Sequence, residues 1–323
     1  MFKNKNVLVA GGAGFIGVNL ILRLLEEGAK IRATLHNKGA VINDDRISYV
    51  KSDLTIRDDC KKVIKDMDYV FMCAANTSGA AVMTKTPLVH VTPNILMNTL
   101  MLEAAYEERV DKFLWFSSNT VYPETDYPVK EDEMMKGDVF EKYFCVAWMK
   151  RFSEILCQMY STKIKVPMKV IVVRPANIFG EYDDFEWETS HVIPALIRKV
   201  VERHNPLEVW GDGKDVKDLI YISDFIEGVM LAMEKLDTYD PINIGTGRPC
   251  SINDALRAML VADDFTDANI VYNTSKPTMI PKRLIDVSKA KTILGFSAKT
   301  SLEDGIKKTI DWYRKNVHLK NSK

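Results

Sequence analysis

Three glycines spaced three residues apart stand near the start of the chain, at Gly11, Gly14 and Gly17. They follow the apolar run Val7–Ala10 and lead into a stretch whose apolar side chains recur at helical spacing. In a strand–loop–helix unit, the first glycine permits a tight turn and the second lets the backbone approach a pyrophosphate. The third lets helix and strand pack closely, and the helix N-terminus faces the phosphates. The spacing therefore predicts a dinucleotide-binding loop.

Short apolar runs alternate with longer helical patterns over the first 175 residues. We expect strands at Val7–Ala10, Lys30–Leu35, Ile47–Val50, Tyr69–Ala74, Phe113–Phe116 and Lys169–Val173. These runs are continuous, which is typical of strands covered on both faces. Helices are expected between them, among them Asn94–Glu108 and Phe144–Tyr160. This order predicts an α/β fold with a Rossmann-type, doubly wound parallel sheet.

The pattern loosens in the C-terminal part of the chain. We expect a dinucleotide-binding domain at 1–175, with returning segments near 219–248. Residues 176–218 and 249–323 are expected to form a smaller mixed α/β lobe that binds substrate. Residues 177–189 are expected to be a loop. Its acidic residues Asp183, Asp184, Glu186 and Glu188 lack the spacing of a metal site.

Composition narrows the class of partner and the compartment. The 44 basic and 44 acidic residues cancel, whereas a nucleic-acid or anionic-membrane partner would require a basic excess. No apolar run is long enough to span a bilayer, and the polar start Met1–Asn6 leaves no room for a signal peptide. The five cysteines are scattered and contain no CxxC pair, so no metal site or disulfide framework is expected. Together these features indicate a cytoplasmic protein.

The residues after the second expected strand bear on the nicotinamide cofactor. An NAD-selective site usually carries an acidic residue there to hold the ribose 2′-hydroxyl. Here Leu35 is followed by His36 and Lys38, whose charges suit a 2′-phosphate. We therefore expect NADP(H) in preference to NAD(H), unless both are merely solvated loop residues. Asp53, after the third strand, suits a hydrogen bond to the adenine amino group, or is only a turn residue.

Several landmarks occur in order along nearly the whole chain. They are GGAGFIG at 11–17, SDL at 52–54, CAA at 73–75, FSSNTVYP at 116–123, RPANIFG at 174–180, YISD at 221–224 and NIGTG at 243–247. Together they resemble the extended short-chain dehydrogenase/reductases, the NAD-dependent epimerase/dehydratase family of sugar-nucleotide enzymes. SHVIPAL at 190–196, VWGDG at 209–213 and SKP at 275–277 are similar, more narrowly, to the GDP-fucose synthases. The resemblance implies an NAD(P)-dependent enzyme acting on a nucleoside-diphosphate sugar, GDP-linked.

The resemblance also implies which residues bind the two ligands. Those expected at the cofactor are Gly11, Gly14, Phe15, Ile16, Gly17, His36, Lys38, Asp53, Leu54, Ala74, Ala75 and Lys150. Those expected at the sugar nucleotide are Asn177, Val209, Lys217 and Arg283, with the two cations at the diphosphate. Lys217 stands where relatives carry an arginine, so it keeps the charge and loses the bidentate fork. Trp210 either shapes the base pocket or belongs to the core.

Family members share a serine or threonine and a Tyr-x-x-x-Lys motif on a helix. Ser118 matches the hydroxyl and Lys150 the lysine, but the tyrosine position holds Val146. General acid–base catalysis contributes roughly 10²–10⁴-fold, so its loss would slow hydride chemistry without forbidding it. We hypothesise that the proton passes to Lys150 through water, or to another group such as His191. Tyr143 is the nearest replacement, but helical side chains lean N-terminally and direct it away from Lys150.

Two further positions bear on epimerisation. His191 matches the histidine that the GDP-fucose synthases use as the acid, and its alternative role is a helix cap. Their base is a cysteine, whereas this chain has Thr120, whose hydroxyl pKa is too high to abstract a carbon-bound proton unaided. Epimerisation by that two-residue route is therefore not expected.

The resemblance implies a homodimer formed through the helices expected at 94–108 and 144–160, with Trp148, Met149 and Phe152 at the interface or simply buried. Two functions remain open. The first is a redox enzyme, either a dehydrogenase/reductase or an epimerase that passes through a keto intermediate, with an atypical proton path. The alternative is a catalytically degenerate protein that binds cofactor and nucleotide sugar and partners an active paralogue. Loss of catalysis would not preferentially spare the serine, lysine and histidine, so we favour the enzyme.

Overall fold

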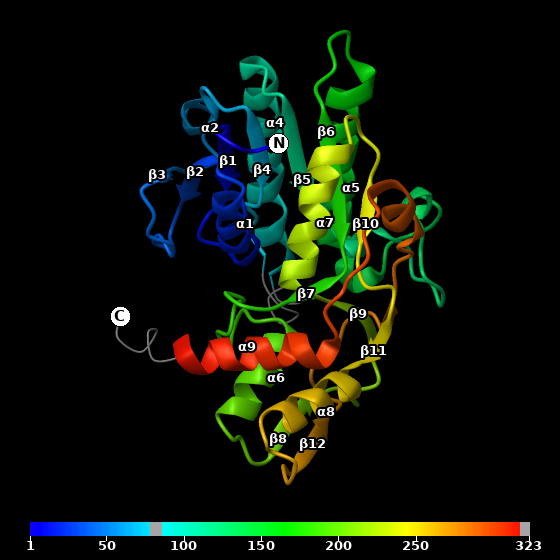
Figure 1. The fold of residues 1–323 in the computed structure, drawn as a ribbon. Helices are drawn as coiled ribbons and strands as arrows, with labels where there is room; N and C mark the ends of the chain where they lie inside the picture. The colour runs from blue at the N-terminus through cyan, green and yellow to red at the C-terminus, as the bar shows by residue number, and fades with distance from the viewer. Residues whose placement is uncertain (78–85, 317–323) are drawn as a thin grey trace.

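A seven-stranded parallel sheet forms the larger part of the structure, a computed structural model that describes residues 1–77 and 86–316 (Figure 1). The strand order is β10-β6-β5-β4-β1-β2-β3. Its strands are β1 (Asn6–Ala10), β2 (Lys30–Leu35), β3 (Ile47–Lys51), β4 (Tyr69–Met72), β5 (Lys112–Phe116), β6 (Val170–Pro175) and β10 (Ile242–Ile244). All neighbouring pairs are parallel, which confirms the expected Rossmann-type sheet.

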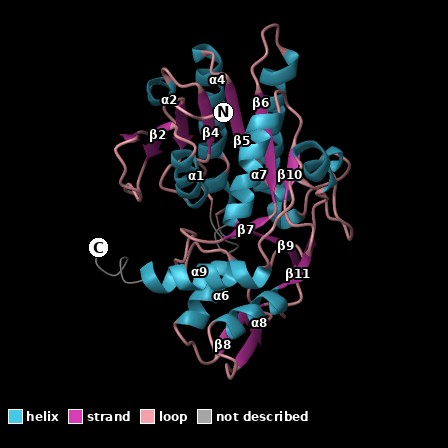
Figure 2. Ribbon diagram, in the orientation of Figure 1, coloured by secondary structure: helices cyan, strands magenta, loops and turns pink. Residues whose placement is uncertain are grey.

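Helices cover both faces of this sheet (Figure 2). One face carries α1 (Phe15–Glu26) and α7 (Ile222–Lys235), and the other carries α2 (Arg57–Ile64), α4 (Thr92–Glu108) and α5 (Phe144–Gln158). In β1, Val7 and Val9 belong to the core on the first face, while Leu8 and Ala10 belong to the core on the second. From Val7 to Ala10 the strand is apolar at every position because neither of its faces meets water there.

A smaller lobe lies beyond the carboxyl end of β6, which leads directly into it (Figure 1). One of its sheets has the order β11-β9-β13 with β7 also paired to β9, and the other joins β8 to β12. Its strands are β7 (Asn177–Phe179), β8 (Leu207–Trp210), β9 (Val216–Tyr221), β11 (Pro249–Ser251), β12 (Ile270–Asn273) and β13 (Lys282–Arg283). Its helices are α6 (Val192–Val201), α8 (Ile252–Ala262) and α9 (Leu302–Asn316).

Short helical turns complete the connections. The 3₁₀ turns are η1 (Pro87–His90), η2 (Asn119–Val121), η3 (Glu131–Glu133) and η4 (Glu141–Tyr143), and the π turns are η5 (Met159–Lys163) and η6 (Ala290–Leu294). Over the described ranges, no helix is both long enough and apolar enough to cross a membrane.

Two sequence expectations about the lobe need correction. Residues 177–189 are not loop throughout, because Asn177–Phe179 form β7 and pair in parallel with β9. A three-residue strand has no period to detect, and only its partner makes it a strand. In addition, β9 (Val216–Tyr221) crosses the boundary expected after residue 218, and the chain then returns to the large sheet with α7 and β10.

Candidate functional site

The glycine loop between β1 and α1 has the shape of a phosphate cradle. Gly11 has φ +86°, and a Cβ there would lie 2.7 Å from the backbone of Ala74. A Cβ on Gly17 would collide with the Gly11 carbonyl, whereas one on Gly14 would meet only that carbonyl, at 3.4 Å. Gly14 caps α1 without a side-chain hydrogen bond, so the first-turn amides after it have no side-chain acceptor. The loop therefore fits the pyrophosphate of a dinucleotide.

Residues expected around the adenosine follow the ends of β2 and β3. His36 and Lys38 are exposed just beyond β2. Asp53 follows β3, and its carboxylate accepts hydrogen bonds from the backbone and hydroxyl of Thr55 at 2.9 and 2.7 Å. These hydrogen bonds lower the pKa of Asp53, with a smaller contribution from the charge of His36. The carboxylate is thus ionised and near the imidazole.

Five other expected cofactor residues lie after β3, after β4 or at the start of α1. Ala74 and Ala75 follow β4, and Ala74 is partly buried against the Gly11 turn while Ala75 is exposed. Phe15 and Ile16 open α1 and are partly buried. Leu54, by contrast, is buried in the core beneath the loop, so only its backbone remains for a ligand. Most of the expected cofactor residues therefore meet at the carboxyl edge of the large sheet.

Ser118 and Thr120 form a hydroxyl pair in the turn that follows β5. The Thr120 hydroxyl donates to the Ser118 oxygen at 2.9 Å, and the Thr120 amide donates to the same oxygen at 3.1 Å. With two donors on its oxygen, Ser118 keeps its own proton to donate elsewhere. Both residues were expected at the active site, and the short turn η2 brings their hydroxyl groups into direct contact.

Lys150 approaches the same segment from α5. Its ammonium donates to the carbonyl of Phe116, the last residue of β5, at 2.7 Å and lies 4.5 Å from the centre of the Trp115 ring. Burial lowers the pKa of Lys150 to about 8, although the charges of Glu154 and Cys157 oppose the shift. An amine with this pKa can give or take a proton near neutral pH.

The position one turn before Lys150 carries no tyrosine, and Tyr143, the nearest candidate to replace it, is engaged elsewhere. Val146 is partly buried one turn before Lys150 on α5. Tyr143 ends η4 immediately before the helix, and its hydroxyl is hydrogen-bonded to the backbone of Ile280. Burial raises the pKa of Tyr143 to about 12, against the opposing charge of Arg283. Tyr143 is therefore engaged with the chain that leads into β13.

His191 precedes α6 and is exposed to solvent. Its side chain makes no capping hydrogen bond to the helix, so the alternative role as a cap is not realised. Desolvation by the surrounding protein lowers the pKa of His191, with the charge of Asp184 opposing the shift. The neutral imidazole, which can accept a proton, is thereby favoured.

Lys217 and Arg283 are neighbours across the parallel strands β9 and β13, in register with one another. Both are buried, and Lys217 donates to the carbonyl of Ile280. Arg283 donates to the carbonyls of Pro123 and Tyr122 at 2.9 and 3.2 Å. Its Nε is buried and has no hydrogen-bond partner among the described residues. The two expected diphosphate ligands thus share one place, and they also hold segments of the chain together.

The other expected substrate residues differ in accessibility. Asn177 opens β7 and is partly buried. Val209 is fully buried in β8, so its side chain packs in the lobe core and leaves only its backbone for a ligand. Trp210 is 40% exposed, with the Lys276 ammonium 5.5 Å from its ring centre, and is therefore not a core residue.

The outer face of α5 carries an exposed apolar stripe. Phe144, Trp148 and Phe152 are 52%, 39% and 44% exposed at intervals of four residues. Met149, expected either with them or simply buried, is only 3% exposed and packs within the subunit, because the i+1 position after Trp148 turns toward the sheet.

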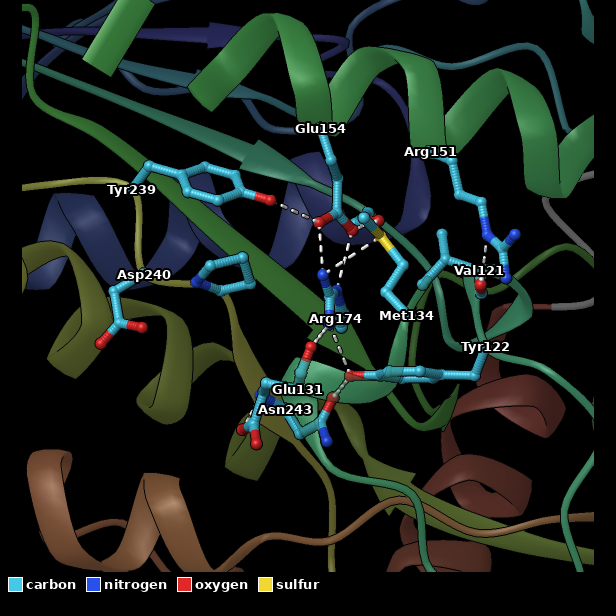
Figure 3. A network of polar contacts seen from close by, with 12 residues as sticks. Val121, Tyr122, Glu131, Met134, Arg151, Glu154, Arg174, Tyr239, Asp240 and Asn243 are labelled. Atoms are coloured by element: carbon cyan, nitrogen blue, oxygen red, sulfur yellow. Dashed lines mark hydrogen bonds and ion pairs between the residues drawn. The ribbon is translucent and has the colours of Figure 1, made fainter. Parts of the chain in front are cut away.

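A buried polar network that the sequence did not predict joins α5 to β6 (Figure 3). Arg174 binds both oxygens of Glu154, at 2.8 and 2.6 Å, and both side chains are almost wholly buried. Arg174 also donates to the Tyr122 hydroxyl at 2.9 Å, and the Ser117 hydroxyl donates to Glu154. The signal available in the sequence was an arginine directly after an apolar strand run, where an unpaired charge would be costly.

Comparisons with known proteins agree with this geometry. The family model for the NAD dependent epimerase/dehydratase family matches residues 7–245. GDP-L-fucose synthase of Sinorhizobium fredii is 28% identical, over 98% of this chain and 98% of that protein. GDP-L-fucose synthase 1 of Arabidopsis thaliana is 27% identical, over 98% of this chain and 95% of that protein.

Solved structures share the fold over nearly the whole chain. UDP-glucose 4-epimerase of Thermotoga maritima, with UDP-glucose, gives a TM-score of 0.87 at 25% identity and covers 97% of this chain and 99% of its own. GDP-mannoheptose C4 reductase of Campylobacter jejuni, with NADP bound, gives 0.81 at 25% identity with the same coverage. MoeE5, in complex with UDP-glucose and NAD, gives 0.83 at 25% identity, again with that coverage. The chain thus belongs to the NAD dependent epimerase/dehydratase family and is an NAD(P)-dependent enzyme.

Proposed function

We propose that this enzyme transfers hydride between a nicotinamide dinucleotide and a carbon of a nucleoside-diphosphate sugar, GDP-linked as in the GDP-L-fucose synthases it resembles. Residues 1–175 would hold the cofactor, and the lobe at 176–218 and 249–323 would hold the sugar nucleotide. One observation carries the proposal. Ser118 lies two residues beyond the end of β5, and the amine of Lys150 binds the carbonyl at that end, at the sheet edge that carries the glycine loop.

Proton transfer is assigned to Lys150 in place of the absent tyrosine. When a keto sugar is reduced, hydride adds to the carbonyl carbon and the oxygen needs one proton. A buried amine with a pKa of about 8 can supply it. Ser118, already an acceptor from Thr120, donates to the same sugar oxygen and relays the proton or orients a water that does. In the oxidative direction the same groups take the proton back.

The preferred cofactor is NADP(H). His36 and Lys38 are exposed beyond the end of β2, and no carboxylate occurs from Leu35 to Lys38. A 2′-phosphate there would meet positive charge, whereas an NAD-selective site needs an acidic residue. The cofactor's contribution when bound is the hydride, and these side chains contribute affinity only.

The diphosphate of the sugar nucleotide is assigned to Lys217 and Arg283. Their register across β9 and β13 brings two buried cations together, and the unpartnered Nε of Arg283 is a donor without an acceptor. Burial lowers the pKa of both side chains, although Asp215, 3.7 Å from the Lys217 ammonium, opposes the shift at Lys217. A phosphate would supply both the charge and the missing acceptor.

A homodimer formed through α5 is part of the proposal. Phe144, Trp148 and Phe152 present a row of apolar surface that water would otherwise cover. A second copy of the chain presents the same row, and a two-fold axis matches the row to itself. Sedimentation of the protein with Trp148→Glu against the unchanged protein tests this part, with a shift to monomer expected.

The second candidate function is a binding protein that has lost catalysis, and Val146 is the observation that favours it. The deciding experiment mixes the purified enzyme with NADPH or NADP⁺ and a panel of GDP-sugars. Absorbance of reduced nicotinamide is followed together with proton NMR of the sugar, because an epimerase regenerates its cofactor. A change in either signal supports the enzyme. Tight binding of cofactor and sugar with neither change overturns it in favour of the binding protein.

A further inference from the structure

Helix α5 reaches the segment Phe116–Val121 at three points, and Figure 3 shows two of the helix residues involved, Arg151 and Glu154. Lys150 binds the first carbonyl of the segment, Glu154 accepts from the hydroxyl of its second residue, and Arg151 donates to the last carbonyl at 2.8 Å. The hydroxyl pair of the candidate site lies between these points. The position of that pair relative to Lys150 is therefore set from one helix.

Arg151 is the unusual member of the three. Its side chain is 1% exposed, and its guanidinium also donates to the carbonyl of Gly137 at 3.0 Å. Within the described part of the chain it forms no ion pair, although Glu154 on the same helix pairs with Arg174. Burial lowers the pKa of Arg151, and the charge of Asp138 only partly opposes this. Two backbone carbonyls thus hold a buried cation that no carboxylate neutralises.

A buried cation of this kind contributes little to the stability of the fold. Removing a charge from water costs several kcal/mol, and hydrogen bonds to neutral carbonyls return only part of this cost. The fork of the guanidinium, however, holds two loops at once from rigid, coplanar donors, a geometry that a lysine ammonium does not reproduce. Val121 closes η2, so holding its carbonyl holds the turn that contains Ser118 and Thr120.

We infer that Arg151 is a positioning residue that fixes the orientation of the Ser118–Thr120 hydroxyl pair relative to Lys150. The inference deepens the proposed function and rests on it for its effect on turnover. Arg151 acts through the Val121 carbonyl, so its loss should reduce kcat and leave KM for the sugar and the affinity for cofactor nearly unchanged. A displacement of about 1 Å in a reacting group can reduce the rate on the order of 10²-fold.

The test compares Arg151→Met with Arg32→Met. Arg32 also donates to two backbone carbonyls, those of Val63 and Lys65 at 3.0 and 2.7 Å, but at the end of α2. We expect Arg151→Met to reduce kcat by about tenfold to 10²-fold and Arg32→Met to leave kcat unchanged. Arg151→Lys, which keeps the charge but lacks the planar fork, should fall between. Hydrogen exchange over residues 117–123 should accelerate in Arg151→Met and not in Arg32→Met.

The outcomes separate the inference from the proposed function. Unchanged exchange over 117–123 in Arg151→Met, or an equal loss of kcat in both variants, overturns the inference. If the unchanged enzyme turns over no sugar nucleotide, the proposed function fails, and the exchange measurement alone decides whether Arg151 fixes the turn. If Arg151→Met does not fold, Arg151→Lys provides the same two measurements, and normal kcat with normal exchange would overturn the inference.

Discussion

The two ends of the candidate site are built differently. At the glycine loop, backbone geometry decides the function, because Gly11 has a positive φ and Gly17 has no room for a Cβ. At the end of β5, side chains decide it, and the position where relatives carry tyrosine holds Val146. Substitutions in the glycine loop disturb its backbone and so its fit to the cofactor. A side chain at the end of β5 can be replaced without disturbing the scaffold, so the sequence determines the cofactor more firmly than the proton path.

The largest effect should come from breaking the cradle. In Gly17→Val, the new side chain would overlap the Gly11 carbonyl, so α1 must move away from the phosphate site. We expect the affinity for dinucleotide to fall by at least about 10²-fold, roughly 2.7 kcal/mol, as measured by calorimetry. Gly39→Val is the control, because a Cβ at Gly39 meets nothing within 4 Å. Equal binding by both variants would contradict the assignment of the loop.

The next largest effect should come from removing the amine. Lys150→Met should reduce kcat by roughly 10²-fold or more, the contribution of a general acid. In the unchanged enzyme, kcat for reduction should fall as pH rises through about 8, because the deprotonated amine has no proton to give. The groups facing Lys150 that affect this value are Glu154 and Cys157. A profile that stays flat up to pH 10 would exclude Lys150 as the donor.

The lowered pKa of Lys150 also predicts how the stability of the enzyme depends on pH. Burial lowers the pKa of Lys150 from 10.5 to about 8, so between these values the unfolded chain binds a proton that the folded enzyme has released. The free energy of unfolding should therefore gain a contribution that rises with pH across that window. Lys150→Met should lack this contribution. Chemical denaturation at several pH values measures it, and an identical pH dependence in both proteins would contradict the shift.

A smaller effect is expected from restoring the family's proton donor. Val146→Tyr should raise kcat by about tenfold if the pocket still accepts the ring, since a general acid typically contributes ~10²–10⁴-fold and Lys150 already supplies part. Val261→Tyr, at an exposed position of α8, is the control and should leave kcat unchanged. An unchanged or lower rate in Val146→Tyr would show that the site is arranged around a different path.

The smallest effect concerns the choice of cofactor. Lys38→Glu should weaken NADPH binding about threefold to tenfold, since an exposed charge pair contributes only ~1 kcal/mol. NADH binding should be unaffected. Lys30→Glu, an exposed change at the opposite end of β2, is the control. Equal loss of both cofactors in Lys38→Glu would argue against a 2′-phosphate contact.

The sequence was sufficient to predict the large sheet because its strands are buried on both faces. Val7–Ala10 and Phe113–Phe116 are continuous apolar runs, and the structure has fully buried strand positions there. The lobe was harder because β7 and β13 are three and two residues long. Such strands exist only through their partners, which lie about forty or more residues away along the chain, and no local period records that pairing.

The candidate site shows the same division. Spacing alone located the glycine loop, and the resemblance located Ser118 and Lys150. It did not locate Arg151 or the pair of Glu154 with Arg174, because the burial of a charge depends on groups that only the fold brings near. The sequence also left open whether Met149 lies at the interface or in the core. An apolar residue on a helix is consistent with core or interface until its neighbours are known.

Helix α5 presents Trp148 outward, and the Trp148 ring lies 4.9 Å from the Arg151 guanidinium that holds the site from within. Whatever covers the outer face of this helix therefore bears on its inner face through one pair of side chains. If a second copy covers this face, contacts from each subunit help to fix the site of the other. Turnover per subunit would then depend on protein concentration, falling on dilution at constant substrate, and assembly and catalysis would be under selection as one trait.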